Sequence, residues 1–109
     1  MRRTLPLRRQ SEIEPMTFRG QTYHVGLSRF DDGSLAETFV STPVKSTSAA
    51  AADARDVAIL ISVALQYGAS VDELRHSITR SETMEGGAHM GDPAGIGGAL
   101  LDKLAEMMK

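Results

Sequence analysis

The feature that most constrains the fold is an almost unbroken apolar run over residues 57–65, in which only Ser62 is polar. Alanines precede this run, so we expect a helix from about Ala49 to Tyr67. A helix that is apolar on nearly every side has to be buried. In a chain of 109 residues, this predicts cover from a sheet on one side and from further helices or a second subunit on the other.

Three β-strands are expected before this helix, at residues 16–19, 22–30 and 35–40. Strict alternation in the second strand places Tyr23, Val25 and Leu27 on one face. The Asp32-Gly33 pair predicts a hairpin turn between the second and third strands. Together these patterns predict a three-stranded antiparallel meander.

Two shorter helices are expected after the long one. Ser70 and Glu73 form a capping-box pattern that begins a helix ending near Thr79. Asp92 followed by Pro93 is typical of the start of another helix. The predicted fold class is therefore α+β, with a three-stranded antiparallel meander followed by a long buried helix and two shorter helices. Residues 1–15 are predicted to form a basic extended arm, and residues 16–109 a single domain.

The composition excludes several classes of chemistry. The chain has no cysteine, which excludes disulfides, thiolate metal sites and thiol catalysis. His24, His76 and His89 lack the spacing of a zinc site, and no hydrolase motif is present, so we predict no metal site. No apolar run reaches the about 18 residues of a membrane span, and no secretory signal follows the first residues, so a cytoplasmic protein is expected.

Three stretches of the chain carry a resemblance to a known family. The first is Arg3-Thr-Leu-Pro-Leu-Arg-Arg9. The second combines Val25-Gly-Leu with the Asp32-Gly33 turn and Glu37-Thr-Phe-Val40. The third is Ser62-Val-Ala-Leu-Gln-Tyr-Gly68, with Val71 and Leu74 behind it. In this order and spacing they resemble the TSCPD domain, the small module at or near the C-terminus of cobalamin-dependent ribonucleotide reductases, which also has small stand-alone homologues.

The resemblance implies a free-standing, non-catalytic accessory or regulatory binding module linked to deoxyribonucleotide metabolism. It does not imply ribonucleotide reduction, because that reaction needs a thiyl radical and a redox-active dithiol, and the chain has no cysteine. The catalytic barrel of the reductases is absent as well, so we expect no enzymatic activity. Cobalamin enters only through the association of the family with these reductases. The candidate partners are a nucleotide, a nucleic acid and a ribonucleotide reductase.

Glu37 is the most interesting single candidate, since the resemblance includes it. If Glu37 faces the long helix together with Leu35 and Phe39, a carboxylate enters an apolar setting, where it could bind a ligand or take up a proton. The alternative places Ala36 and Thr38 inward and leaves Glu37 on the solvent side. Alternation along the strand is compatible with both arrangements.

Both ends of the long helix carry further candidate ligand contacts. Side chains just before it could hold a phosphate at the helix N-terminus, with plain helix capping as the alternative. They are Lys45, Ser46, Thr47 and Ser48. At the other end, Gln66 and Tyr67 either line a cleft or interface or satisfy local backbone groups.

The basic arm leads to a second hypothesis about function. Its arginines either contact nucleic acid or a protein partner, or they are solvated and mobile. They are Arg2, Arg3, Arg8 and Arg9. In the first case the chain is a small dimeric interaction protein without a link to the reductase. A homodimer is expected under both hypotheses, because sheet edges need cover and the helix over residues 57–65 is too apolar for a small monomer to bury.

Overall fold

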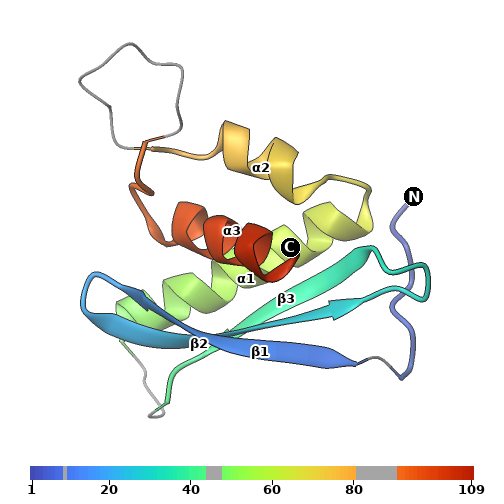
Figure 1. The fold of residues 1–109 in the computed structure, drawn as a ribbon, viewed down its shortest axis with the longest axis horizontal. Coiled ribbons are helices and arrows are strands. Elements are labelled where there is room, and N and C mark those ends of the chain that lie inside the picture. Colours follow the sequence, from blue (N-terminus) through green and yellow to red (C-terminus); the bar gives the residue numbers. More distant parts are fainter. Residues whose placement is uncertain (9, 44–47, 81–90) are drawn as a thin grey trace.

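The computed structural model describes residues 1–8, 10–43, 48–80 and 91–109. In these parts of the chain three strands precede three helices, and the helices lie on one side of the sheet (Figure 1). The strands form one antiparallel sheet in the order β1-β2-β3. This α+β arrangement confirms the predicted fold class. The elements are β1 (Ser11–Phe18), β2 (Gln21–Arg29), β3 (Leu35–Ser41), α1 (Ala49–Gln66), α2 (Val71–Ser77) and α3 (Ile96–Met107).

Both hairpin turns depend on glycine. Gly20 and Gly33 have φ angles of 77° and 88°, a region that residues with a side chain rarely adopt. Asp32 accepts a hydrogen bond from the backbone N–H of Ser34 at 2.9 Å, the contact that makes aspartate common in turns. The hairpin predicted at Asp32-Gly33 is therefore confirmed.

β1 begins at Ser11, earlier than the predicted start at residue 16. Residues 11–15, which the sequence placed in the arm, pair with β2 along the edge of the sheet, where Pro15 lies opposite His24. Proline is tolerated there because an edge strand needs no N–H on its outer side. The proline and the two neighbouring glutamates obscured the strand pattern.

The core lies between the sheet and the helices α1 and α3. Val25 and Leu27 are buried as predicted, in one apolar cluster with Leu100 of α3. At the rim of this cluster, Lys103 of α3 donates to Glu14 of β1 at 3.0 Å. This contact, above all its hydrogen bond, raises the pKa of Lys103 and links α3 to the edge of the sheet. α2 packs on α3, further from the strands (Figure 1).

α1 is buried along the face that packs on the sheet. Ala54, Ala58 and Leu65 lie on this face, whereas Ile59 and Leu60 are 60% and 68% exposed. α3 also packs on α1, so a further helix supplies part of the cover expected on the second side, and the outward positions stay uncovered within the described residues.

The face of the sheet opposite the helices carries the ring of Phe39. This ring lies so close over Gly26 of β2 that a Cβ at residue 26 would collide with it. The glycine in the Val25-Gly-Leu stretch is therefore explained by cross-strand packing with β3, where Gly26 is the register partner of Phe39.

α3 begins at Ile96, later than the predicted start at Pro93. Arg80 and Pro93 form an isolated antiparallel bridge, and the carbonyl of Ala94 accepts from Arg19 at 2.6 Å. These contacts hold the preceding segment out of a helical conformation. By contrast, the capping box predicted at the start of α2 is present. Within the described ranges, no helix is long and apolar enough to cross a membrane.

Candidate functional site

Two polar side chains, one helical turn apart, bond α1 to the edge of β3. The hydroxyl of Ser62 accepts from the backbone N–H of Thr38 at 2.9 Å and lies at the same distance from the Thr38 carbonyl. The side-chain amide of Gln66 donates to the carbonyl of Ala36 at 3.1 Å. Backbone groups on the outer edge of a sheet have no strand partner. α1 therefore covers this edge with its own side chains.

The N-terminal arm is bonded to the same glutamine. The backbone N–H of Arg3 donates to the Gln66 carbonyl at 2.8 Å, and Nε of Arg2 donates to the Gln66 side-chain oxygen at 2.7 Å. Gln66 is buried, and both ends of its amide have partners. Satisfying backbone groups, one of its two predicted roles, describes these contacts, but the backbone group belongs to a distant strand.

Arg3 connects the arm to the turn between β2 and β3. Its guanidinium lies 3.7 Å from the centre of the Phe30 ring and donates to Asp32 at 3.3 Å and to Ser34 at 3.1 Å. The hydrogen bonds from Ser34, together with the weaker effect of Arg3, lower the pKa of Asp32. The ion pair itself is exposed and contributes little. We call the set Arg2, Arg3, Phe30, Asp32, Ser34 and Gln66 the arm–turn junction.

Three cavities adjoin the arm–turn junction. One, of about 350 Å³, lies between the arm and the hairpin and is lined by Arg8, Arg29 and Phe30 among others. Arg8 makes no hydrogen bond or ion pair within the described residues. Two more cavities, each of about 310 Å³, lie where Arg2 meets Gln66 and between the β2–β3 turn and the C-terminal end of α1. All three cavities are at the lower end of the volumes of small-molecule sites.

Glu37 lies on the open face of the sheet, away from the helices. Its neighbours Ala36 and Thr38 are buried toward the core, so the alternative arrangement is the one observed. Glu37 is half-buried and accepts a hydrogen bond from the hydroxyl of Ser28 at 2.7 Å. The structure therefore does not bring Glu37 into the arm–turn junction.

The predicted phosphate contacts before α1 are described only at Ser48. Its side chain accepts from the N–H of Ala51 at 3.1 Å, which is the capping alternative. Tyr67 is the C-terminal cap of α1 and leaves its side chain 63% exposed. The remaining candidates, Lys45, Ser46, Thr47 and Arg9, lie outside the described residues.

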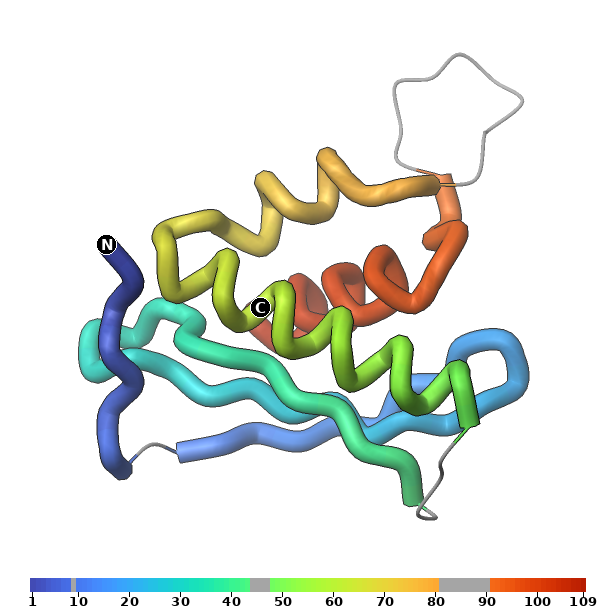
Figure 2. Tube along the Cα trace, turned by 180° about the vertical axis from the view of Figure 1, so that it is seen from behind, coloured from blue at the N-terminus to red at the C-terminus, as the bar shows by residue number. Residues whose placement is uncertain are grey.

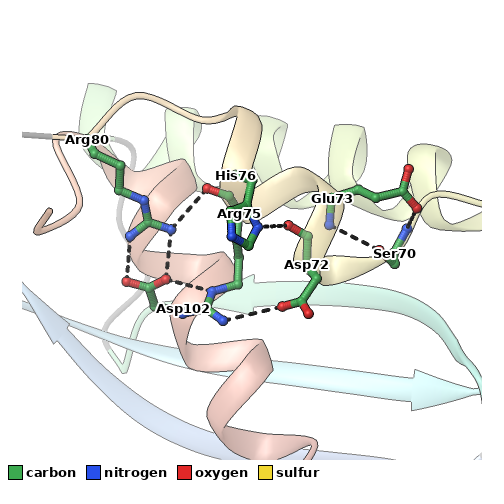
Figure 3. Close-up of polar contacts among 7 residues, drawn as sticks. All are labelled: Ser70, Asp72, Glu73, Arg75, His76, Arg80 and Asp102. Carbon is green, nitrogen blue, oxygen red and sulfur yellow. Dashed lines mark hydrogen bonds and ion pairs between the residues drawn. The ribbon is translucent and has the colours of Figure 1, made fainter. Parts of the chain in front are cut away.

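A charged cluster that was not predicted from the sequence joins α2 to α3 (Figure 3). Arg80 donates two hydrogen bonds to the carboxylate of Asp102, at 2.7 and 2.8 Å, and Arg75 donates a third at 3.0 Å. These contacts, led by the hydrogen bonds from Arg80, lower the pKa of Asp102. No local pattern indicates the cluster, because its partners are 22 and 27 positions apart.

An apolar cavity of about 370 Å³ between α1, α2 and the start of α3 was also missed. Leu60, Leu74 and Ile78 form part of its wall. A Cβ at Gly97 would lie 3.2 Å from Ile78, so the glycines that open α3 were the available signal of a close approach. The described lining includes no histidine that could ligate the cobalt of cobalamin, and we assign the cofactor no place in it.

The three stretches that carried the family resemblance meet at one end of the molecule. Arg3 of the first stretch contacts both Asp32 of the second and Gln66 of the third. In a comparison with known families, residues 3–107 match the TSCPD domain. The chain belongs to the TSCPD domain family. The match covers this small domain and no catalytic domain. No match was found among curated proteins or among solved structures. In this TSCPD domain, the shared stretches bond the arm, the hairpin and α1 to one another.

Proposed function

We propose that this TSCPD domain is a non-catalytic accessory binding module linked to deoxyribonucleotide metabolism. The observation that carries the proposal is the family match over residues 3–107 in a chain without cysteine. The association of the family with cobalamin-dependent ribonucleotide reductases supports the metabolic link. The missing thiols support a role in binding, since the radical and the dithiol of ribonucleotide reduction both require cysteine.

Within this proposal, the cavity between the arm and the hairpin binds a phosphate-bearing ligand. Arg8 lines it without a bond to any described residue, so its guanidinium is available. Arginine binds phosphate through two parallel hydrogen bonds. Arg29 also lines the cavity, but it is ion-paired with Glu12 at 3.7 Å. The carboxylates of Glu12 and Asp31 lie in the same wall, so the phosphate contact is assigned to Arg8. A nucleotide offers a phosphate group that the guanidinium of Arg8 can bind.

Titration calorimetry with ribonucleoside and deoxyribonucleoside triphosphates tests the proposal. We expect Arg8→Ala to weaken binding about tenfold or more, because a charge-assisted contact is lost. Arg55→Ala is the matched control, since Arg55 is exposed on α1, does not line the cavity and makes no ion pair within the described residues. Absence of heat with every nucleotide contradicts the proposed ligand. Equal weakening by both variants contradicts the proposed position of the site.

Nucleic-acid binding through the arm has less support as a second function. Arg2 and Arg3 are bonded within the chain, which leaves Arg8 as the available arginine in the described part of the arm. Binding through phosphate contacts normally needs several free cations. A gel shift with short DNA that disappears when residues 1–10 are deleted would favour this function over the first.

A further inference from the structure

α1 carries exposed apolar side chains along the face that points away from the sheet. Ile59, Leu60 and Tyr67 are 60%, 68% and 63% exposed, and the half-buried Val63 lies between them. Figure 2 views the molecule from the side on which α1 runs in front of α3. Residues three or four apart are neighbours on a helix surface. These four side chains therefore form one apolar surface, which we call the α1 stripe.

Rotation of α1 about its axis would be needed to turn the α1 stripe toward the sheet. Ser62 and Gln66 are bonded to β3 on another side of the helix, and these bonds fix the rotation of α1 about its axis. The same bonds cover the β3 edge, so strand pairing does not compete at that edge. Clustered exposed apolar side chains mark interaction surfaces. Among the described residues no other segment covers the α1 stripe, so a second molecule is the candidate for its cover.

The polar groups at the two ends of the α1 stripe indicate which molecule this is. Asp53 and Asp56 precede the stripe on the same side of α1; both are exposed, and neither makes an ion pair within the described residues. The other end carries the hydroxyl of Tyr67, with Arg2 bonded to the adjacent Gln66. The α1 stripe thus has one end with carboxylates and one end with hydrogen-bond donors. It complements a copy of itself when the two helices run antiparallel, whereas parallel pairing sets the aspartates against each other.

We propose that α1 pairs antiparallel with α1 of a second copy of this chain through the α1 stripe. A twofold axis at the middle of the stripe sets Leu60 of one copy against Val63 of the other. Asp56 lies four residues before Leu60, and Tyr67 lies four residues after Val63. Asp56 therefore faces Tyr67 of the second copy, and the symmetry repeats each contact. This proposal does not depend on the proposed function.

Light scattering coupled to size-exclusion chromatography, over a range of protein concentrations, tests the association. The expected mass is twice the 11.7 kDa of one chain. Leu60→Glu is expected to halve that mass while the circular dichroism spectrum stays unchanged. Arg55→Glu, which places the same residue on α1 outside the stripe, is expected to remain dimeric. A wild-type protein with the mass of one chain at every concentration overturns the proposal, and so does a dimeric Leu60→Glu variant.

Disulfide cross-linking tests the direction of the helices, because the chain has no cysteine of its own. A disulfide requires Cα atoms about 4.4–6.8 Å apart. In the antiparallel pair, the double variant Asp56→Cys/Tyr67→Cys places each new thiol opposite a thiol of the second copy. We expect it to form a covalent dimer on mild oxidation, and each single variant to stay monomeric on a non-reducing gel. Cross-linking of both single variants indicates parallel helices and overturns the proposal, as does a double variant that fails to cross-link.

Discussion

Ser62 is the polar interruption of the apolar run in α1, and its hydroxyl serves several backbone groups. The oxygen accepts the N–H of Thr38, and the proton lies within reach of the carbonyls of Thr38 and Ala58, at 2.9 and 2.8 Å. The side chain is buried, so water does not take the place of these partners. The edge strand that Ser62 faces therefore explains why a hydroxyl interrupts the run.

We expect Ser62→Ala to lower the free energy of unfolding by about 1–3 kcal/mol, because the N–H of Thr38 is left buried without a partner. Ser77→Ala is the matched control, since Ser77 also donates to a carbonyl four residues earlier, but on the exposed surface. For the control we expect a change of about 0.5 kcal/mol or less. Urea unfolding followed by circular dichroism measures both variants. Equal losses would mean that the bond to the edge strand adds no stability.

For single residues, the sequence indicated the kind of contact better than the partner. Gln66 was expected to satisfy backbone groups or line a cleft, but its acceptor Ala36 is 30 positions away. Side chains alternate between the two faces of β3, but both faces carry apolar residues, so alternation does not show which face is buried. The choice between them depends on packing against α1, and the register irregularity beside Ser28 in β2 complicates the pattern further. Alternation alone therefore does not assign the face of the sheet that holds Glu37.

Among the elements, local signals predicted boundaries well where no distant contact opposed them. The capping box at Ser70 and the turn at Gly33 depend on atoms a few residues away, and both are present. The predicted starts of β1 and α3 were wrong. β1 begins earlier because residues 11–15 pair with β2, and α3 begins later because Pro93 forms a bridge with Arg80. Such pairings join segments far apart in the sequence and leave no periodic pattern.

The link between α2 and α3 is expected to depend on pH through Asp102. Arg80, followed by Arg75, holds the pKa of this carboxylate below its ordinary value of 3.8. A lowered pKa in the folded state stabilises the fold above the unfolded pKa, and this stabilisation is lost as the pH falls through the folded pKa. We expect Asp102→Asn to cost about 2 kcal/mol at neutral pH, since hydrogen bonds to two partly buried arginines are weakened. The difference from the wild type should shrink below about pH 4.

Urea unfolding at a series of pH values measures this dependence. Asp53→Asn is the control, because Asp53 is exposed on α1 and makes no ion pair within the described residues. The control curve should run parallel to that of the wild type. A loss in Asp102→Asn that stays constant from neutral to acid pH would contradict the assignment of the effect to the carboxylate charge.

In the molecule as a whole, the start of the arm is bonded to the folded body. Deletion of residues 1–5 removes the two bonds to Gln66 and the stacking of Arg3 on Phe30. We expect it to lower the free energy of unfolding by about 1–2 kcal/mol, although the deleted residues are mostly exposed. Arg8→Ala, which removes no bond, should change it by about 0.5 kcal/mol or less. An unaltered urea midpoint in the deletion variant would mean that the arm contacts add no stability.

The same long-range contacts explain how much of the candidate site the sequence could predict. The resemblance identified the family, which the match over residues 3–107 confirms, because the stretches that carry it each have a local pattern. Their meeting point could not be inferred, since Arg3 is 29 positions from Asp32 and Arg2 is 64 positions from Gln66. The order of the stretches along the chain thus predicts the family, and only the fold shows that they form one junction.

In α1, the side chains that bond the helix to β3 are different from the side chains that face outward. Ser62 and Gln66 fix how the helix packs on β3. Leu60, Val63 and Tyr67 do not contribute to these bonds. Substitutions at the outward positions can therefore accumulate without altering the internal bonds. A domain built in this way can exchange one binding partner for another through a few changes on a single helix, while its architecture is inherited unchanged.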